Sequence, residues 1–99
     1  MVEVPEPAMF FTSKSPHRVL FYTRRQCHLC DEALDLLHQF SRRYPMCVDI
    51  VDVDHAPSLQ AEFGEVVPVV FIDGVKRFFG RIDPVLLRRL LEAPATGAI

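Results

Sequence analysis

The chain has 99 residues, of which 49% are hydrophobic and 24% are charged, and its formal net charge is −2. This length and composition fit one small domain with a hydrophobic core and exclude a chain that is disordered throughout. The mixed charges give no electrostatic reason to expect binding to nucleic acids or membrane surfaces. No apolar run approaches the roughly 18 residues that a membrane-spanning helix requires.

Residues 1–17 contain two glutamates, three prolines and no early basic cluster. A secretory signal would combine a basic start with an apolar stretch of about 7–15 residues. We therefore expect a flexible lead-in over residues 1–17 and a cytoplasmic protein. The chain has three cysteines, and an odd count in a short chain argues against a secreted disulfide scaffold. In a reducing compartment, a close pair of cysteines is more often catalytic or metal-binding than structural.

A short apolar run within residues 18–23 predicts a buried strand. From Asp31 onwards, apolar residues recur at the spacing of one helix face, and they are Ala33, Leu36, Leu37, Phe40 and Tyr44. Pro45 is expected to end this helix. Residues 47–53 predict a second strand, whose two aspartates indicate that one side or edge of it faces solvent.

Residues 56–64 predict a short helix that is closed by a glycine. The uniformly apolar residues 69–72 predict a central strand. Asp73 and Gly74 form a strong signal for a two-residue hairpin turn. Residues 75–79 are therefore expected to be the antiparallel partner of the central strand.

Asp83 followed by Pro84 is typical of a helix start, in which the aspartate is the N-cap and the proline occupies the first turn. The apolar stripe of this helix consists of Leu86, Leu87, Leu90 and Leu91. Pro94 marks its end, and residues 94–99 are expected to be a frayed tail.

The predicted order of elements is β-α-β-α-β-β-α, in one domain over residues 18–93. The first strand, helix and second strand make a parallel, right-handed crossover, and the later strands close as a hairpin. The two apolar strands belong in the middle of the sheet and the two charged strands at its edges. The sequence therefore predicts an α/β fold with a four-stranded mixed sheet in the order 2-1-3-4 and helices on both faces.

Cys27 and Cys30 lie at the junction between the first strand and the first helix. Cys30 falls within the first helical turn, so the two sulfurs can approach bonding distance. The helix start has unpaired N–H groups and a partial positive charge, which favour a thiolate at Cys27, and Arg24 and Arg25 can add to that charge. Such a thiolate attacks a disulfide and forms a mixed disulfide, from which Cys30 displaces the product.

A zinc half-site and an inert pair are the alternatives to this redox chemistry. A closed zinc site needs four ligands, and the other candidate ligands are dispersed along the chain: His17, His28, His38, Cys47 and His55. We therefore expect no bound metal. Cys47 is interpreted as a small core residue, and His17, His38 and His55 are interpreted as surface polar residues. His28 is interpreted either as a residue that stabilises the thiolate when protonated or as a solvated turn residue.

The segment LFYTRRQCHLCDEALDLL resembles the active-site segment of the glutaredoxin-like family, and VVPVVFIDG resembles the cis-proline strand of that family. The resemblance covers about residues 18–92 and implies a thioredoxin fold of the glutaredoxin type. It implies that Cys27 is the nucleophile, that Cys30 is the resolving cysteine and that Pro68 is a cis-proline opposite them. It also implies that the backbone of Val67 pairs with an extended substrate.

Glutaredoxins carry a Gly-Gly-x-Asp-Asp turn that holds glutathione, and the resemblance places that turn at Gly80. Here the turn reads Gly80-Arg81-Ile82-Asp83-Pro84. Arg81 lies where a substrate anion would sit, while Pro84 lacks both the acid and the N–H of the residue that it replaces. The candidate substrate-binding residues are Arg24, Arg25, Val67, Pro68, Gly80 and Arg81.

The resemblance implies a thiol–disulfide oxidoreductase that acts on protein disulfides or glutathione mixed disulfides. The sulfurs carry the chemistry, so no prosthetic group is expected, and glutathione is a candidate co-substrate. The expected partners are a disulfide-bearing protein or glutathione, and a reductant of unknown identity. We expect neither nucleic acid nor a membrane as a partner. The alternative is a non-catalytic binding module of the same fold that holds zinc or a protein partner through the cysteine pair.

Overall fold

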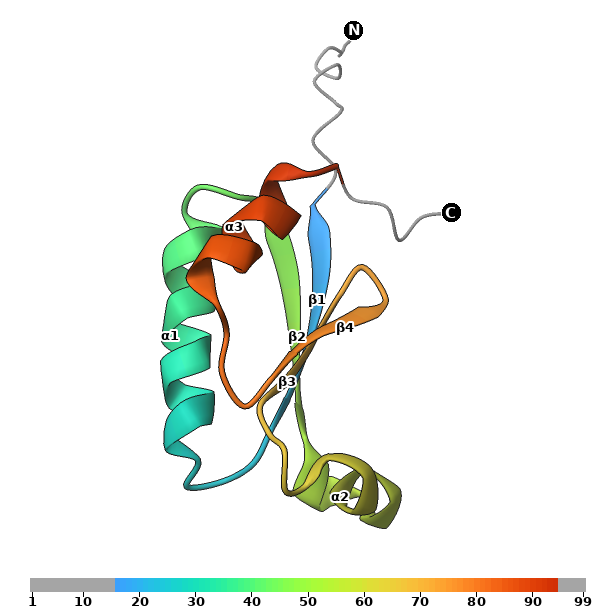
Figure 1. Cartoon of the computed structure of the whole chain (residues 1–99). Coiled ribbons are helices and arrows are strands. Elements are labelled where there is room, and N and C mark those ends of the chain that lie inside the picture. Colours follow the sequence, from blue (N-terminus) through green and yellow to red (C-terminus); the bar gives the residue numbers. More distant parts are fainter. Residues whose placement is uncertain (1–15, 95–99) are drawn as a thin grey trace, which may run out of the picture.

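The computed structural model describes residues 16–94, in which four strands form one mixed sheet (Figure 1). The strands are β1 (His17–Thr23), β2 (Met46–Asp52), β3 (Val69–Ile72) and β4 (Val75–Phe79). β1 and β2 are parallel, whereas β3 pairs antiparallel with both β1 and β4. The sheet order is β2-β1-β3-β4, which confirms the predicted order. The expected lead-in and tail fall almost entirely outside the described residues.

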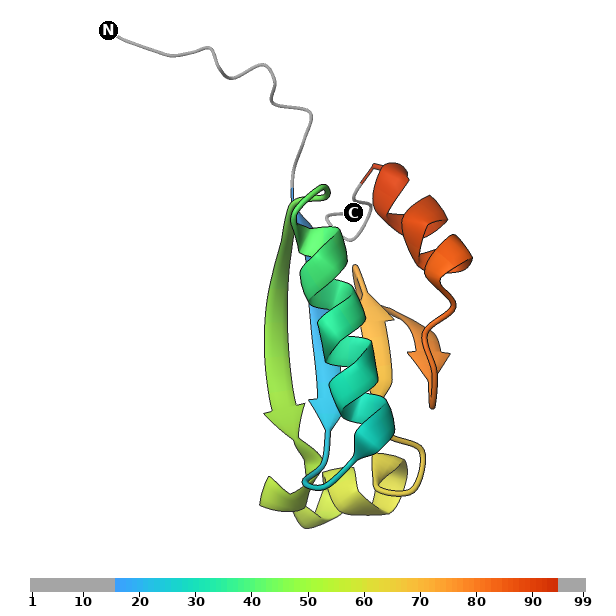
Figure 2. The same ribbon diagram turned by 90° about the vertical axis from the view of Figure 1, so that its left-hand side faces the viewer.

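The helices are α1 (His28–Ser41), α2 (Pro57–Phe63) and α3 (Pro84–Glu92), and a short 3₁₀ helix, η2 (Val53–His55), precedes α2. α1 and α3 pack on one face of the sheet, and α2 packs on the opposite face at one end of the molecule (Figures 1 and 2). The predicted arrangement of helices on both faces is therefore confirmed.

Local sequence explains where two of the helices begin. α1 starts at His28 with Cys27 as its N-cap, which confirms that Cys30 lies within the first helical turn. In α3 the N-cap is Asp83, as predicted, and its carboxylate accepts a hydrogen bond of 2.9 Å from the N–H of Val85. Both helix starts thus have a side chain that satisfies a backbone donor with no partner inside the helix.

The main core lies between the sheet and helices α1 and α3. Phe21 of β1, Leu37 of α1 and Leu87 of α3 are fully buried within it. A second cluster on the opposite face contains Phe63 of α2, on which the ring of Tyr22 stacks with centroids 4.6 Å apart. The buried residues of the central strands thus attach helices to both faces of the sheet.

His17 is buried, which corrects the prediction of a surface polar residue: only 4% of it is exposed. Its Nδ1 atom lies 2.7 Å from Oδ2 of Asp73 in the hairpin turn, and its Nε2 atom lies 3.0 Å from the backbone oxygen of Leu91. The ring therefore joins the start of β1 to the hairpin and to the last turn of α3. These partners lie 56 and 74 residues away along the chain, so nothing in the local sequence pointed to them.

Cys47 is exposed, which corrects the prediction of a core residue. Met46 and Val48 on either side of it pack against the main core, so strand alternation turns Cys47 to the opposite face of the sheet. Arg18, the residue beside it on β1, is exposed as well. The apolar neighbours of Cys47 were thus a poor guide, because β2 is an edge strand that buries only one side.

Candidate active site

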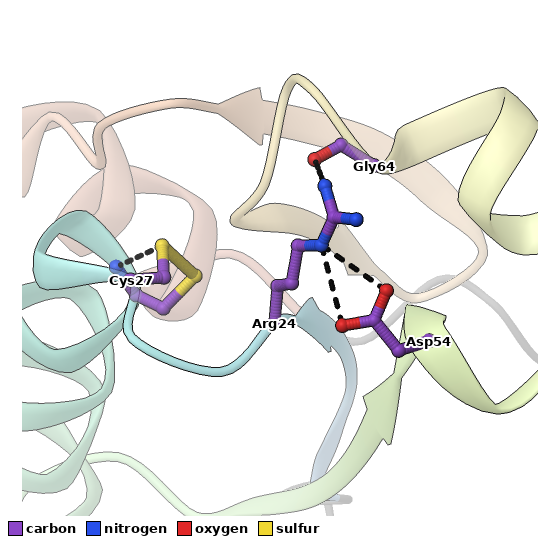
Figure 3. Close-up of a disulfide and its surroundings, with 5 residues drawn as sticks. Arg24, Cys27, Asp54 and Gly64 are labelled. Atoms are coloured by element: carbon purple, nitrogen blue, oxygen red, sulfur yellow. Dashed lines mark hydrogen bonds and ion pairs between the residues drawn. A yellow bond between two sulfur atoms is a disulfide. The ribbon is translucent and has the colours of Figure 1, made fainter.

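Cys27 and Cys30 form a disulfide at the start of α1 (Figure 3). Their Cα atoms lie 5.1 Å apart. The Sγ atom of Cys27 accepts a hydrogen bond of 3.1 Å from the N–H of Cys30. Cys30 is 3% exposed and belongs to the main core, whereas Cys27 is only partly buried. The pair therefore has an outer cysteine near solvent and an inner cysteine shielded by apolar side chains.

The residue directly before the outer cysteine has an unusual backbone conformation. Gln26 has a φ angle of 54°, in the left-handed region that side chains other than glycine rarely adopt. Such conformations persist only where the surrounding structure holds them. The short loop between β1 and α1 must therefore be fixed on both sides of Gln26.

The side chain of Arg24 donates its hydrogen bonds to other residues of the chain. Its Nε atom donates to both carboxylate oxygens of Asp54, at 3.1 and 3.2 Å, and its Nη1 atom donates to the carbonyl oxygen of Gly64 at 2.9 Å (Figure 3). Gln60 also donates to Oδ1 of Asp54, at 2.8 Å. The hydrogen bonds from Gln60 and Arg24 lower the pKa of the Asp54 carboxyl.

Sequence reasoning missed Asp54, Gln60 and Gly64 as residues of this region. One signal was available, because Asp54 comes directly after the predicted second strand. The carboxyl ends of parallel strands meet at one edge of a sheet, where the loop after the first strand also lies. A polar residue at that position was therefore a candidate neighbour of Arg24.

The peptide bond between Val67 and Pro68 is cis, as the resemblance implied. Pro68 is fully buried, and Val67 packs against the same core cluster as Cys27. The N–H of Gly80 donates a hydrogen bond of 2.9 Å to the carbonyl oxygen of Pro68. These contacts link three of the predicted substrate-binding residues to one another and, through the shared cluster, to the outer cysteine.

Arg81 extends from the loop after β4 toward α1. Its Nη1 atom lies 3.8 Å from Oε1 of Glu32, and both side chains are largely exposed. A hollow of about 230 Å³ adjoins this pair, and its apolar lining includes Leu29, Ala33, Leu36 and Ile82. Because Leu29 stands between the two cysteines in the sequence, the hollow borders the cysteine motif.

Arg25 and His28 are exposed on either side of Cys27 in the sequence. Their roles in substrate binding and in thiolate stabilisation stay predictions. Within residues 16–94, no three His, Cys, Asp or Glu side chains are grouped so that they could hold a metal ion. Over the same residues, every helix is too short or too polar to cross a membrane.

Residues 18–92 match the family described as a glutaredoxin-like domain (DUF836). The chain is also 33% identical over 76 residues to the uncharacterized protein Rv0508 of Mycobacterium tuberculosis, a match that covers 72% of this chain and 78% of that protein. The uncharacterized protein Mb0520 of Mycobacterium bovis matches with the same identity and coverage.

Solved structures share the fold at low sequence identity. Protein Ne2328 from Nitrosomonas europaea has a TM-score of 0.70 at 21% identity, over 79% of this chain and 94% of that chain. The glutaredoxin-like protein NrdH-redoxin from Escherichia coli has a TM-score of 0.58 at 22% identity, over 78% of this chain and 99% of that chain. A mutant thioredoxin from Halobacterium salinarum has a TM-score of 0.59 at 23% identity, over 86% of this chain and 80% of that chain. With the family match over residues 18–92, the chain belongs to the glutaredoxin-like domain family and has the thioredoxin fold.

Proposed function

We propose that this protein is a thiol–disulfide oxidoreductase that works through Cys27 and Cys30. The observation that carries the proposal is the asymmetry of the pair at the start of α1. Cys27 caps the helix and is partly exposed, whereas Cys30 is 3% exposed and within bonding reach of it. This arrangement suits an attacking sulfur that meets the substrate and a resolving sulfur that meets only its partner.

The reaction runs in two exchanges. In the reduced protein, the Cys27 thiolate attacks one sulfur of the substrate disulfide, that disulfide breaks, and the departing thiolate takes up a proton from solvent. Cys30 then loses its proton and attacks the Sγ atom of Cys27, so the substrate leaves as a second thiol and the Cys27–Cys30 disulfide closes. Two electrons pass from the dithiol to the substrate, and a cellular dithiol or two glutathione molecules must return them.

Protein disulfides are the preferred substrates in this proposal, ahead of glutathione mixed disulfides. Arg81 faces Glu32 at 3.8 Å, so its charge is partly compensated, and Pro84 offers no N–H at the first position of α3. A glutathione carboxylate therefore has fewer donors here than in a Gly-Gly-x-Asp-Asp turn. The NrdH-redoxin of the same fold is described as glutaredoxin-like with a thioredoxin-like activity profile, which supports the same preference.

The proposal requires no prosthetic group, because the sulfur atoms of Cys27 and Cys30 carry the two electrons that pass to the substrate. It also includes a cytoplasmic location, since a reducing compartment returns the dithiol to its reduced form between turnovers.

The test compares the reduction of insulin disulfides with the reduction of a glutathione mixed disulfide by the same preparation. The wild type is expected to reduce insulin more efficiently, Cys27→Ser to reduce neither substrate, and Cys30→Ser to accumulate mixed disulfides. A preference for the glutathione substrate would reject the substrate assignment and leave the dithiol chemistry intact. A wild type that reduces neither substrate and carries zinc in elemental analysis would instead be a binding module.

A further inference from the structure

We propose that Arg24 is a positioning residue, which holds the loop before Cys27 against the segment that leads to Pro68. The inference rests on the proposed thiol–disulfide exchange. It assigns Arg24 a different role from the substrate contact expected from the sequence. We call Arg24, Asp54 and Gly64 the clamp.

The clamp joins three segments that are distant in the sequence. Arg24 lies just after β1, Asp54 lies in η2 after β2, and Gly64 follows the last residue of α2. The guanidinium reaches Asp54 across 30 positions and Gly64 across 40 positions of the chain. These segments meet at the same end of the molecule, drawn at the bottom of Figures 1 and 2.

The acceptor side of the clamp is itself held in place. The N–H of Asp54 donates to Oδ1 of Asp52 at 2.8 Å, and Gln60 donates to Oδ1 of Asp54 at the same distance. The side chains of Arg24 and Asp54 are 39% and 30% exposed, so the ion pair lies at the surface and solvent screens part of it. An ordered acceptor loses little freedom when the guanidinium binds, which favours one fixed geometry.

Gly64 lies too close to its neighbours to carry a side chain without a shift, first to the carbonyl of Gln60 and then to Arg24. The φ of −56° and ψ of −30° of Gly64 are open to any residue, so backbone conformation does not require glycine here. A Cβ atom at this position would lie 2.5 Å from the carbonyl oxygen of Gln60 and 3.3 Å from Nη1 of Arg24. Close approach is therefore the reason that glycine fits this position.

The clamp acts on the dithiol through the two short segments that it connects. On one side, Arg24 anchors the loop in which Gln26 holds its φ of 54°, while the helix cap at Cys27 anchors the other end. On the other side, Gly64 leads to the cis bond before Pro68, and the backbone of Val67 is the docking edge for the substrate that the resemblance implies. Fixing both segments to one guanidinium keeps the attacking sulfur aligned with that edge, and small displacements of reacting groups slow a reaction strongly.

The experiment is a double-mutant cycle on the full chain with Arg24→Ala, Asp54→Ala and the double variant. Two readouts are taken: kcat and KM for insulin reduction, and the equilibrium constant of the Cys27–Cys30 pair against glutathione redox buffers. The single variants are each expected to lower kcat and to change the equilibrium constant by about two- to fivefold, the coupling that a partly exposed ion pair gives, and to change KM less than kcat. The double variant is expected to be no worse than either single variant.

Arg77→Ala removes an exposed arginine of β4 outside this region and is expected to leave both readouts at wild-type values. Arg24→Lys and Asp54→Asn repeat the cycle with milder changes if an alanine variant unfolds, since lysine keeps the charge but lacks the planar fork. An Arg24→Ala effect confined to KM, or one that adds to that of Asp54→Ala, would overturn the proposal. The redox equilibrium is measured without turnover. It therefore tests the coupling between Arg24 and Asp54 even if the proposed activity is wrong.

Discussion

The Sγ atom of Cys27 accepts a hydrogen bond of 3.1 Å from the N–H of Cys30, so the outer cysteine caps the helix that contains the inner one. Helix caps are usually oxygen atoms, and a neutral sulfur is a weak acceptor. A thiolate is a stronger acceptor, because hydrogen bonds to ionised groups are stronger. Reduction and ionisation of Cys27 are therefore expected to strengthen the cap, and the helix start in turn is expected to stabilise the thiolate.

The first prediction is that iodoacetamide alkylates Cys27 of the reduced protein at lower pH than it alkylates either other cysteine. Cys30 is shielded, with 3% exposure, and Cys47 is exposed but lies on a strand without a helix cap. Peptide mapping after short labelling times, repeated across pH, gives the three rates in one sample. Cys47 is the internal control, and identical pH profiles for Cys27 and Cys47 would show that the cap does not stabilise the thiolate.

The second prediction concerns the start of α3, where this chain has Pro84 and the glutaredoxin turn that the segment resembles has an acidic residue. Pro84→Asp restores an N–H and a carboxylate at that position, and one regained charge-assisted contact contributes about 1.5–3 kcal/mol. Glutathione is therefore expected to bind about ten- to a hundredfold more tightly to the variant. Calorimetric titration in a Cys27→Ser background measures binding without reaction. Pro45→Asp, a change at another exposed proline, is the control, and an equal gain there would mean that the added charge acts nonspecifically.

The sequence predicted the strand order because its signals are local. Uniformly apolar runs marked the central strands β1 and β3, and the pair Asp73-Gly74 marked the hairpin. Both turn residues have positive φ angles, of 52° and 86°, as a two-residue hairpin turn between these strands demands. The cysteine pair was equally readable, since its spacing and its place before a helix bring the two sulfurs within bonding distance.

The features that the sequence did not reveal depend on contacts between distant segments. Arg24 was expected to contact substrate. Its partners Asp54 and Gly64 lie 30 and 40 positions away, so the local sequence gave no sign of them. His17 was misplaced at the surface for the same reason, since its burial comes from the hairpin and from α3. A polar side chain carries no periodic signal that distinguishes a solvated position from a satisfied buried one.

The third prediction is that His17→Ala destabilises the fold. The substitution leaves the buried carbonyl of Leu91 without the donor 3.0 Å away and opens space between β1 and α3. An unsatisfied buried acceptor costs about 1–3 kcal/mol, so the free energy of unfolding is expected to fall by at least that amount. Urea unfolding followed by circular dichroism measures it. His38→Ala, at an exposed position of α1, should change the free energy by no more than about 0.5 kcal/mol. Similar losses in both variants would mean that the buried contacts of His17 add nothing.

The last prediction concerns the pH dependence that Asp54 gives to the fold. Hydrogen bonds from Gln60 and Arg24 lower the pKa of its carboxyl in the folded state below the value of 3.8 for a free side chain. A group with a depressed folded pKa binds its proton more readily in the unfolded chain. Its contribution to stability is therefore fully present above the unfolded pKa and is lost as the pH falls through the folded pKa.

Thermal unfolding of the wild type and of Asp54→Asn, followed from neutral pH to below about pH 4, tests this linkage. The wild type is expected to be the more stable of the two at neutral pH, and the difference is expected to shrink on acidification, because protonated Asp54 and asparagine are both neutral. Asp49→Asn, at an exposed position of β2 outside the clamp, is the matched control and should track the wild type over the whole range. A difference between wild type and Asp54→Asn that stays constant with pH would mean that the carboxylate charge contributes nothing to the clamp. In that case Arg24 would be held by the carbonyl of Gly64 and by packing alone.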